Sequence, residues 1–138
     1  MAGQLKISPA PDGTQFQRVD EAVEAFSREQ GWPGELDFAI RLFLEELVLN
    51  AVNYGTDDRS TGIELDVTSD DREVRILLVD NGRPFNPLAD APEPDTDSPV
   101  EERPVGGLGV HLVQSLADSV SYERVDGRNR LTVVKLRS

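Results

Sequence analysis

The chain has 138 residues, 38% of them hydrophobic, which is the size of a single domain that can bury its own core. It contains no cysteine and one histidine, which excludes disulfides and thiolate metal sites and leaves few ligands for zinc. Its formal net charge of −12 would repel phosphate backbones and anionic lipids, so neither nucleic acid nor a membrane surface is expected as a partner.

Two helices are predicted first. Thr14 to Gln17 has the form of a capping box, and apolar residues then recur at helical spacing until Gly31 ends the run. These apolar residues are Phe16, Val19, Ala22, Val23 and Phe26. After Pro33, which suits a first helical turn, residues 36–55 are apolar almost all round. We expect a surface helix with one buried face, followed by a helix buried between other elements.

Two hairpins and a third helix are predicted next. Residues 63–67 ("IELDV") alternate with period two, Asp70-Asp71 forms a turn, and residues 74–82 ("VRILLVDNG") form a nearly continuous apolar strand. Four apolar residues between 110 and 117 share one face of a helix. Beyond it, "SVSYERV" and "RLTVVKL" flank Asp126-Gly127, which predicts a second hairpin.

The segment between the hairpins is a predicted mobile loop, because residues 86–104 are rich in Pro, Asp and Glu and poor in large apolar side chains. It could link two small domains, but each would hold only about 50 to 85 residues, a size of marginal stability. We therefore predict one α/β domain over residues 1–138, a two-layer sandwich with helices covering one face of a mixed, mostly antiparallel sheet. No membrane span or signal peptide is recognisable, so a cytoplasmic location is expected.

Polar residues form one stripe on the second predicted helix. Glu46, Asn50 and Asn53 fall at i, i+4 and i+7 between apolar flanks. Such a stripe is usually the solvated face of a helix. This one holds a carboxylate and amides rather than Lys or Arg, and a carboxylate among apolar neighbours needs a partner, a metal or a catalytic task. Both interpretations are open at this point.

The end of the apolar strand carries Asp80, Asn81 and Gly82. Asn-Gly and Asp-x-Gly are ordinary turn sequences, so a tight turn is the simplest interpretation. The functional alternative is that Asp80 accepts a hydrogen bond from an exocyclic amine, while Gly82 lets the backbone approach a flat ring. A base bound in this way would be selected by its donors.

Three glycines stand directly before the third predicted helix. Gly106, Gly107 and Gly109 could serve only a loop and a close helix contact. Alternatively, free amides at a helix N-terminus form a cradle for phosphate oxygens. No Lys follows the cluster, so it is not a P-loop, and in a chain this acidic Arg103 is a candidate to offset the surrounding charge.

In their order, these motifs resemble the GHKL superfamily, the ATP-binding fold shared by gyrase, the heat-shock chaperone ATPase, histidine kinases and mismatch-repair proteins. "EELVLNAVNYG" resembles its first ATP box, "DNGRPF" its second and "GGLG" its third, and residues 36–134 carry the resemblance. A free-standing domain of this size is similar to the anti-sigma-factor serine kinases of bacterial partner switches. The resemblance implies a Bergerat-type sandwich, with ATP between the helices and a mobile lid at about residues 86–109.

The resemblance also implies a role for each matching residue. Asn50 would ligate Mg²⁺, Glu46 would be the general base, and Asp80 would contact the adenine amine. Thr132 would support that contact through water. The other residues expected at the nucleotide are Asn53, Gly82, Phe85, Arg103, Gly106, Gly107, Leu108 and Gly109. These roles fit the chemistry, because Mg²⁺ takes few protein ligands and a carboxylate one helical turn away can orient an attacking hydroxyl.

Some features depart from histidine kinases. Asn53 stands where those proteins often have Lys, no phosphoacceptor helix pair precedes the domain, and the only histidine, His111, lies within the glycine-cluster helix. Histidine autokinase activity is therefore not expected. The predicted lid is acidic where phosphate must bind, so it either folds away from the nucleotide or serves another surface.

Two functions are compatible with these observations. The first is a serine/threonine protein kinase that uses Mg²⁺-ATP to phosphorylate an antagonist protein and, in its other partner state, sequesters a sigma factor. The second is a non-catalytic module in which nucleotide stabilises a surface that binds a regulator. A nucleotide-free structural domain would require all three motifs to be purely structural, and their order argues against it. Protein partners are expected, and a homodimer is compatible with the resemblance.

Overall fold

The computed structural model describes residues 3–8, 16–50, 62–82, 84, 86 and 107–137. The strands are β1 (Gly3–Ile7), β2 (Ile63–Ser69), β3 (Glu73–Asp80), β4 (Ser119–Val125) and β5 (Arg128–Leu136). The helices are α1 (Phe16–Gln30), α2 (Gly34–Asn50) and α4 (Gly107–Leu116). Both predicted hairpins and all three predicted helices are therefore confirmed. The predicted continuation of α2 to residue 55 and most of the acidic loop lie outside the described residues.

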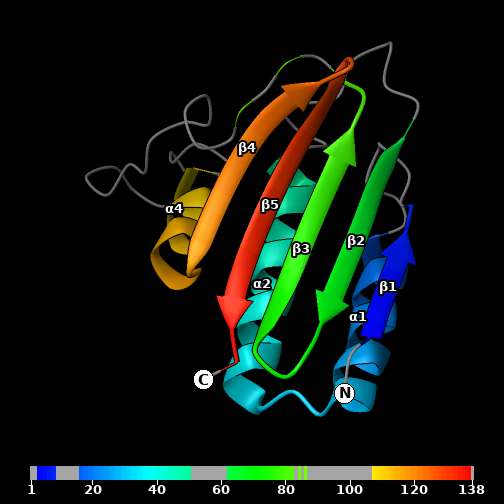
Figure 1. The fold of residues 1–138 in the computed structure, drawn as a ribbon, viewed down its shortest axis with the longest axis vertical. Coiled ribbons are helices and arrows are strands. Elements are labelled where there is room, and N and C mark those ends of the chain that lie inside the picture. The colour runs from blue at the N-terminus through cyan, green and yellow to red at the C-terminus, as the bar shows by residue number, and fades with distance from the viewer. Residues whose placement is uncertain are drawn as a thin grey trace.

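The strands form one sheet in the order β1-β2-β3-β5-β4. Each neighbouring pair is antiparallel, so the described sheet is antiparallel throughout, where the sequence predicted a mixed one. The three helices lie on one face of this sheet, and its other face is turned toward the viewer in Figure 1. The predicted two-layer sandwich is confirmed.

The sequence does not predict the edge strand β1, because its only apolar alternation is Leu5 and Ile7. β1 pairs with β2, and both side chains pack against the core while remaining half-buried. Gly3 lies close to α1, since a Cβ there would meet Gln30 Nε2 at 2.3 Å. Pairing with β2 and contact with α1 thus define a strand that its own pattern does not.

Gly31 ends α1, as the sequence predicts. Its φ is 66°, and the amide of Trp32 donates to the carbonyl of Ser27 at 3.1 Å, which closes the last helical turn. The Trp32 indole then packs edge-on against Phe26 and donates to Ser69 Oγ at 3.0 Å. This contact ties the α1–α2 connection to the sheet.

The second helix is not buried all round, so that prediction was wrong. Ile40, Phe43 and Leu44 are buried against the sheet, but Phe38 is 67% exposed and Glu45 is exposed. The helices form a single layer in which α2 lies between α1 and α4, so its outer side faces water (Figure 1).

The core lies between the helix layer and the sheet. The largest side chains that are almost completely buried in it are Val19, Val23, Ile40, Phe43, Val48, Ile63, Val67, Val74, Ile76, Val113 and Val133. They come from α1, α2, α4 and strands β2, β3 and β5. Close packing of these β-branched and aromatic side chains makes α2 and β3 a rigid support for any side chain at their ends.

The substitution Gly127→Ala is expected to lower the free energy of unfolding by about 1 kcal/mol. The turn from β4 to β5 has positive φ at Asp126 (52°) and Gly127 (77°), as the predicted hairpin requires. A Cβ on Gly127 would meet nothing within 4 Å, so the cost comes from the backbone alone. Gly34→Ala is the matched control, because its Cβ also meets open space but it opens α2. Urea unfolding measures both, and equal stability of the two variants would contradict this account.

Candidate functional site

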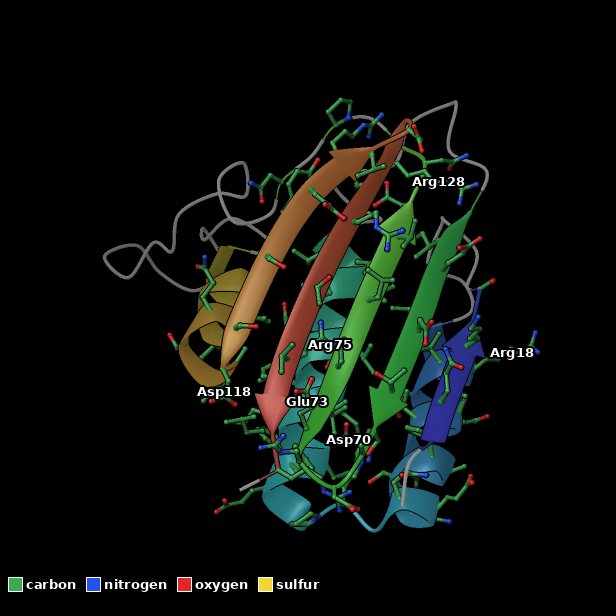
Figure 2. The ribbon with its side chains drawn as sticks, viewed as in Figure 1. Arg18, Asp70, Glu73, Arg75, Asp118 and Arg128 are labelled. Atoms are coloured by element: carbon green, nitrogen blue, oxygen red, sulfur yellow. The ribbon has the colours of Figure 1, made fainter. Side chains whose placement is uncertain are left out.

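Three of the predicted motifs meet at one end of the molecule. The C-terminal ends of α2 and β3 and the N-terminal end of α4 all lie at the upper end of Figure 1. α2 packs against both β3 and α4. In Figure 2 this end is marked by Arg128, and the opposite end by Asp70 in the β2–β3 turn. The fold therefore brings together the elements that carry the three motifs.

Asp80 is the last residue of β3 and is only 7% exposed. Its Oδ1 accepts hydrogen bonds from the Gly82 amide (3.0 Å) and from Asn129 Nδ2 (2.9 Å). The bond from Gly82 closes a turn on the Asp side chain, so the predicted tight turn is confirmed. Among the described residues both bonds go to Oδ1, which leaves Oδ2 as the acceptor for a ligand. A buried carboxylate with one oxygen committed and one available has the chemistry to bind a hydrogen-bond donor of a ligand as well as to close a turn.

Asn129 is a residue of this site that sequence reasoning missed. It lies in β5 directly opposite Asp80 and is 4% exposed. Its Oδ1 accepts bonds from the Tyr122 hydroxyl (2.5 Å) and from Arg124 Nη1 (3.1 Å). Arg124 Nη1 also donates to the carbonyl of Gly82 at 2.9 Å. We call these five residues the Asp80 network. In the sequence, an Asn two residues after a hairpin glycine is typical of a turn, so nothing marked Asn129 as a site residue.

Glu46 is half-buried on α2. Burial raises the pKa of this carboxyl, and the charge of neighbouring Glu45 raises it further. Glu45 itself is exposed, whereas Glu46 is partly shielded from water. A raised pKa makes a carboxylate a stronger base. Asn50 follows one turn later on the same helix face, and its side chain lies outside what the structure describes.

This combination of fold and motifs is matched by a known family. The model of the histidine kinase-like ATPase domain matches residues 9–135. The chain belongs to this family. The match runs from the segment before α1 into β5, so one ATPase domain contains Glu46, the Asp80 network and the glycines of α4.

Two curated proteins are similar to this ATPase domain over most of their lengths. The serine/threonine-protein kinase BtrW of Bordetella bronchiseptica is 29% identical over 112 residues, which are 80% of this chain and 78% of that protein. The anti-sigma F factor of Clostridium acetobutylicum is 26% identical over 133 residues, which are 96% of this chain and 90% of that protein.

A solved structure has the same fold. The histidine kinase domain of the blue-light activated histidine kinase from Erythrobacter litoralis EL346 superposes with a TM-score of 0.56 at 20% identity. The match covers 92% of this chain and 61% of that chain, and it supports the fold alone. In the part of the chain that the structure describes, no helix has the length and apolar character needed to cross a membrane.

The structure does not bring Thr132 to Asp80. Thr132 lies opposite Leu77 in β5, and its neighbours Leu131 and Val133 are the ones that point into the core. Because Asp80 and Asn129 share the core side, Thr132 lies on the other face of the sheet. Asn129 is therefore the β5 residue that contacts Asp80.

The glycine motif opens a helix, as the sequence predicts. Gly107, Leu108 and Gly109 form the first turn of α4, where free amides and the positive end of the helix dipole favour an anion. The remaining predicted nucleotide contacts lie outside the described residues: Asn53, Phe85, Arg103 and Gly106. Among the described residues, no cluster of three or more His, Cys, Asp or Glu side chains could hold a metal ion.

The described donors and acceptors fit the adenine of ATP. The adenine 6-amino group is a hydrogen-bond donor, and the Asp80 carboxylate offers it an acceptor oxygen. Gly82 is buried beside that carboxylate and has no Cβ to obstruct a flat ring. Nucleotide use follows from membership of an ATPase-domain family, and the chemistry of these groups is compatible with a contact to the base.

Proposed function

We propose that this chain is a serine/threonine protein kinase that transfers the γ-phosphoryl group of Mg²⁺-ATP to an antagonist protein. In its other partner state it binds and sequesters a sigma factor. The observation that carries the proposal is the ATPase-domain match over residues 9–135, together with two similar proteins named for these two activities. The half-buried carboxylate of Glu46 supports a catalytic role, because burial raises its pKa and carboxylates with perturbed pKa values cluster at functional sites.

Each part of the nucleotide has a place in this proposal. Asp80 accepts a hydrogen bond from the adenine amine, and the first turn of α4 supplies amides to the phosphates. Asn50 would hold Mg²⁺, which offsets phosphate charge when it is bound. The oxygen of the Asn50 side chain and the phosphates suit the preference of this ion for few protein ligands.

Glu46 acts as the base in the transfer step. Its carboxylate accepts the proton of the acceptor Ser or Thr hydroxyl, whose oxygen attacks the γ-phosphorus. The bond between the γ-phosphorus and the β,γ-bridging oxygen breaks, and ADP leaves with the electron pair. The products are ADP and a phosphoserine or phosphothreonine ester. The raised pKa of Glu46 favours proton acceptance in this step.

The proposal is tested by incubating the chain with ATP labelled at the γ-phosphate and a candidate antagonist protein. Label on a Ser or Thr of the antagonist supports the kinase. ATP binding with a stable protein complex but no label would overturn the transfer step, and it would favour the non-catalytic module. Absence of ATP binding would overturn the nucleotide site itself.

The rate of transfer is expected to fall as pH decreases through the raised pKa of Glu46, because only the deprotonated carboxylate accepts a proton. The Glu45 charge contributes to that shift, so Glu45→Gln is expected to move the acidic limb of the profile toward lower pH. The measurement is kcat against pH for both proteins. A limb that lies at the ordinary Glu pKa and does not move in Glu45→Gln would contradict a base role for Glu46.

A further inference from the structure

We propose that Arg124 and Asn129 form a hydrogen-bond relay that holds the Asp80 carboxylate in the orientation that selects a 6-aminopurine over a 6-oxopurine. The inference rests on the proposed function, because it requires that Asp80 face the purine of a bound nucleotide. Arg124 and Asn129 are positioning residues in this account. They act through Asp80 and do not contact the nucleotide.

The relay begins at Arg124, whose guanidinium donates hydrogen bonds and cannot accept them. Its Nη1 contacts Asn129 Oδ1 at 3.1 Å, so this atom of the amide must be the carbonyl oxygen. The Tyr122 hydroxyl, which also contacts Oδ1, can both donate and accept and does not define the orientation by itself. Arg124 therefore determines which way the Asn129 amide faces.

Once the amide is oriented, its NH₂ group must face Asp80. Asn129 Nδ2 lies 2.9 Å from Asp80 Oδ1, and the backbone amide of Gly82, also a donor only, lies 3.0 Å from the same oxygen. Two donors therefore require Oδ1 to accept. They also restrain the rotation of the carboxylate, since an intermediate rotation would distort both bonds.

The second oxygen of Asp80, Oδ2, is the atom that a bound purine would contact. An ionised carboxylate accepts at both oxygens, so with Oδ1 held by two donors it is Oδ2 that meets the base as an acceptor. It matches the amino group of adenine and opposes the carbonyl oxygen that inosine and guanosine carry at the same position. Asp80 and Asn129 are both buried, so an unmatched contact has little water to compensate it.

Arg124 also connects Asn129 with the backbone that follows β3. The Nη1 group that orients Asn129 donates to the carbonyl of Gly82 at 2.9 Å. One guanidinium from the β4–β5 hairpin thus holds both the relay and the backbone that follows β3. Loss of Arg124 would release the Asn129 amide to flip and would free the Gly82 turn at the same time.

The test compares the affinities of ATP and inosine triphosphate, both with Mg²⁺, by calorimetry. The wild-type chain is expected to bind ATP at least about tenfold more tightly. Asn129→Leu, which keeps the branching at Cγ and removes the amide, is expected to reduce this ratio to below about threefold. Asn129→Asp places a second carboxyl against Asp80, and two such groups share a proton. It is expected to weaken ATP while leaving inosine triphosphate unchanged or tighter.

Arg124→Met and Arg130→Met form a matched pair. Arg130 lies in β5 on the opposite face of the sheet, where it pairs with Glu123 at 3.3 Å. Both substitutions remove one positive charge, so both lower the affinity for any triphosphate. Only Arg124→Met is expected to reduce the ratio of the two affinities, by at least about threefold.

The outcomes separate the relay from the proposed function. A wild-type chain that binds neither nucleotide, or that binds both equally, overturns the proposed adenine contact and the relay with it. Wild-type preference for ATP that persists in folded Asn129→Leu and Arg124→Met overturns the relay alone. If the Asn129 variants do not fold, the Arg124→Met and Arg130→Met comparison decides. A purely structural role would lower melting temperatures without changing the ratio.

Discussion

Glu46→Gln is expected to reduce phosphoryl transfer by about 10²- to 10⁴-fold while ATP affinity changes by less than about threefold. The amide keeps the size of the side chain but cannot take up the proton of the Ser or Thr hydroxyl that is phosphorylated. Single-turnover transfer to the antagonist, together with calorimetric ATP binding, measures the two quantities separately.

The expected change in the melting temperature of Glu46→Gln distinguishes loss of the catalytic base from misfolding of the variant. Burial raises the pKa of Glu46 in the folded state, so the ionised group disfavours folding at pH values above that pKa. Removal of the charge is therefore expected to leave the melting temperature at pH 7 unchanged or higher. Glu45→Gln is the matched control, because Glu45 is exposed and adjacent, and its transfer rate at pH 7 should stay close to wild type. Equal loss of binding and transfer in Glu46→Gln would contradict a base role.

Asp80→Asn is expected to weaken ATP binding by about 10- to 100-fold. The Asn oxygen can still accept the bonds from Gly82 (3.0 Å) and Asn129 (2.9 Å), so the turn is retained. The atom offered to the base then becomes an NH₂ group, which opposes the adenine amine. Inosine triphosphate, with a carbonyl at that position, should lose less affinity than ATP. Calorimetric titration with each nucleotide measures the difference.

Asp70→Asn is the control for this substitution. Like Asp80, Asp70 accepts two bonds through Oδ1, in its case both from backbone amides, those of Arg72 (2.8 Å) and Glu73 (2.9 Å), but it lies at the opposite end of the sheet (Figure 2). Both variants replace a turn carboxylate by an amide that can still accept the turn bonds, but Asp70 is exposed and Asp80 is buried, so the comparison concerns ATP affinity and not stability. ATP affinity that falls equally in both variants, or in neither, would be inconsistent with an adenine contact at Asp80.

Much of the fold could be predicted because its signals are local. Gly31 and the Asp126-Gly127 turn end their elements through backbone conformations that the residues themselves favour. β1 could not be predicted, since pairing with β2 defines it and Leu5 and Ile7 alone are too short a pattern. The exposed side of α2 was missed for a related reason. An apolar helix with Phe38 on its surface has the same composition as one that is fully enclosed.

In the candidate site, too, the residues that come together only through strand pairing could not be predicted. Asp80 and Gly82 were recognisable because their spacing forms a motif along the chain. Asn129 is 49 residues away from Asp80 and becomes its neighbour only through the register of β3 and β5. Thr132 was chosen from that strand on sequence alone, and the alternation of side chains in β5 places it on the other face. A one-residue change of register inverts which side chains reach a site, and sequence patterns rarely determine that register.

The central claim is that this ATPase domain binds Mg²⁺-ATP through the three motifs, and the most direct measurement is calorimetric titration of the chain with ATP, with and without Mg²⁺, beside Asn50→Ala. We expect binding that Mg²⁺ strengthens and that Asn50→Ala loses in large part. Absence of binding under any of these conditions, or binding to which both Mg²⁺ and Asn50 are irrelevant, would contradict it.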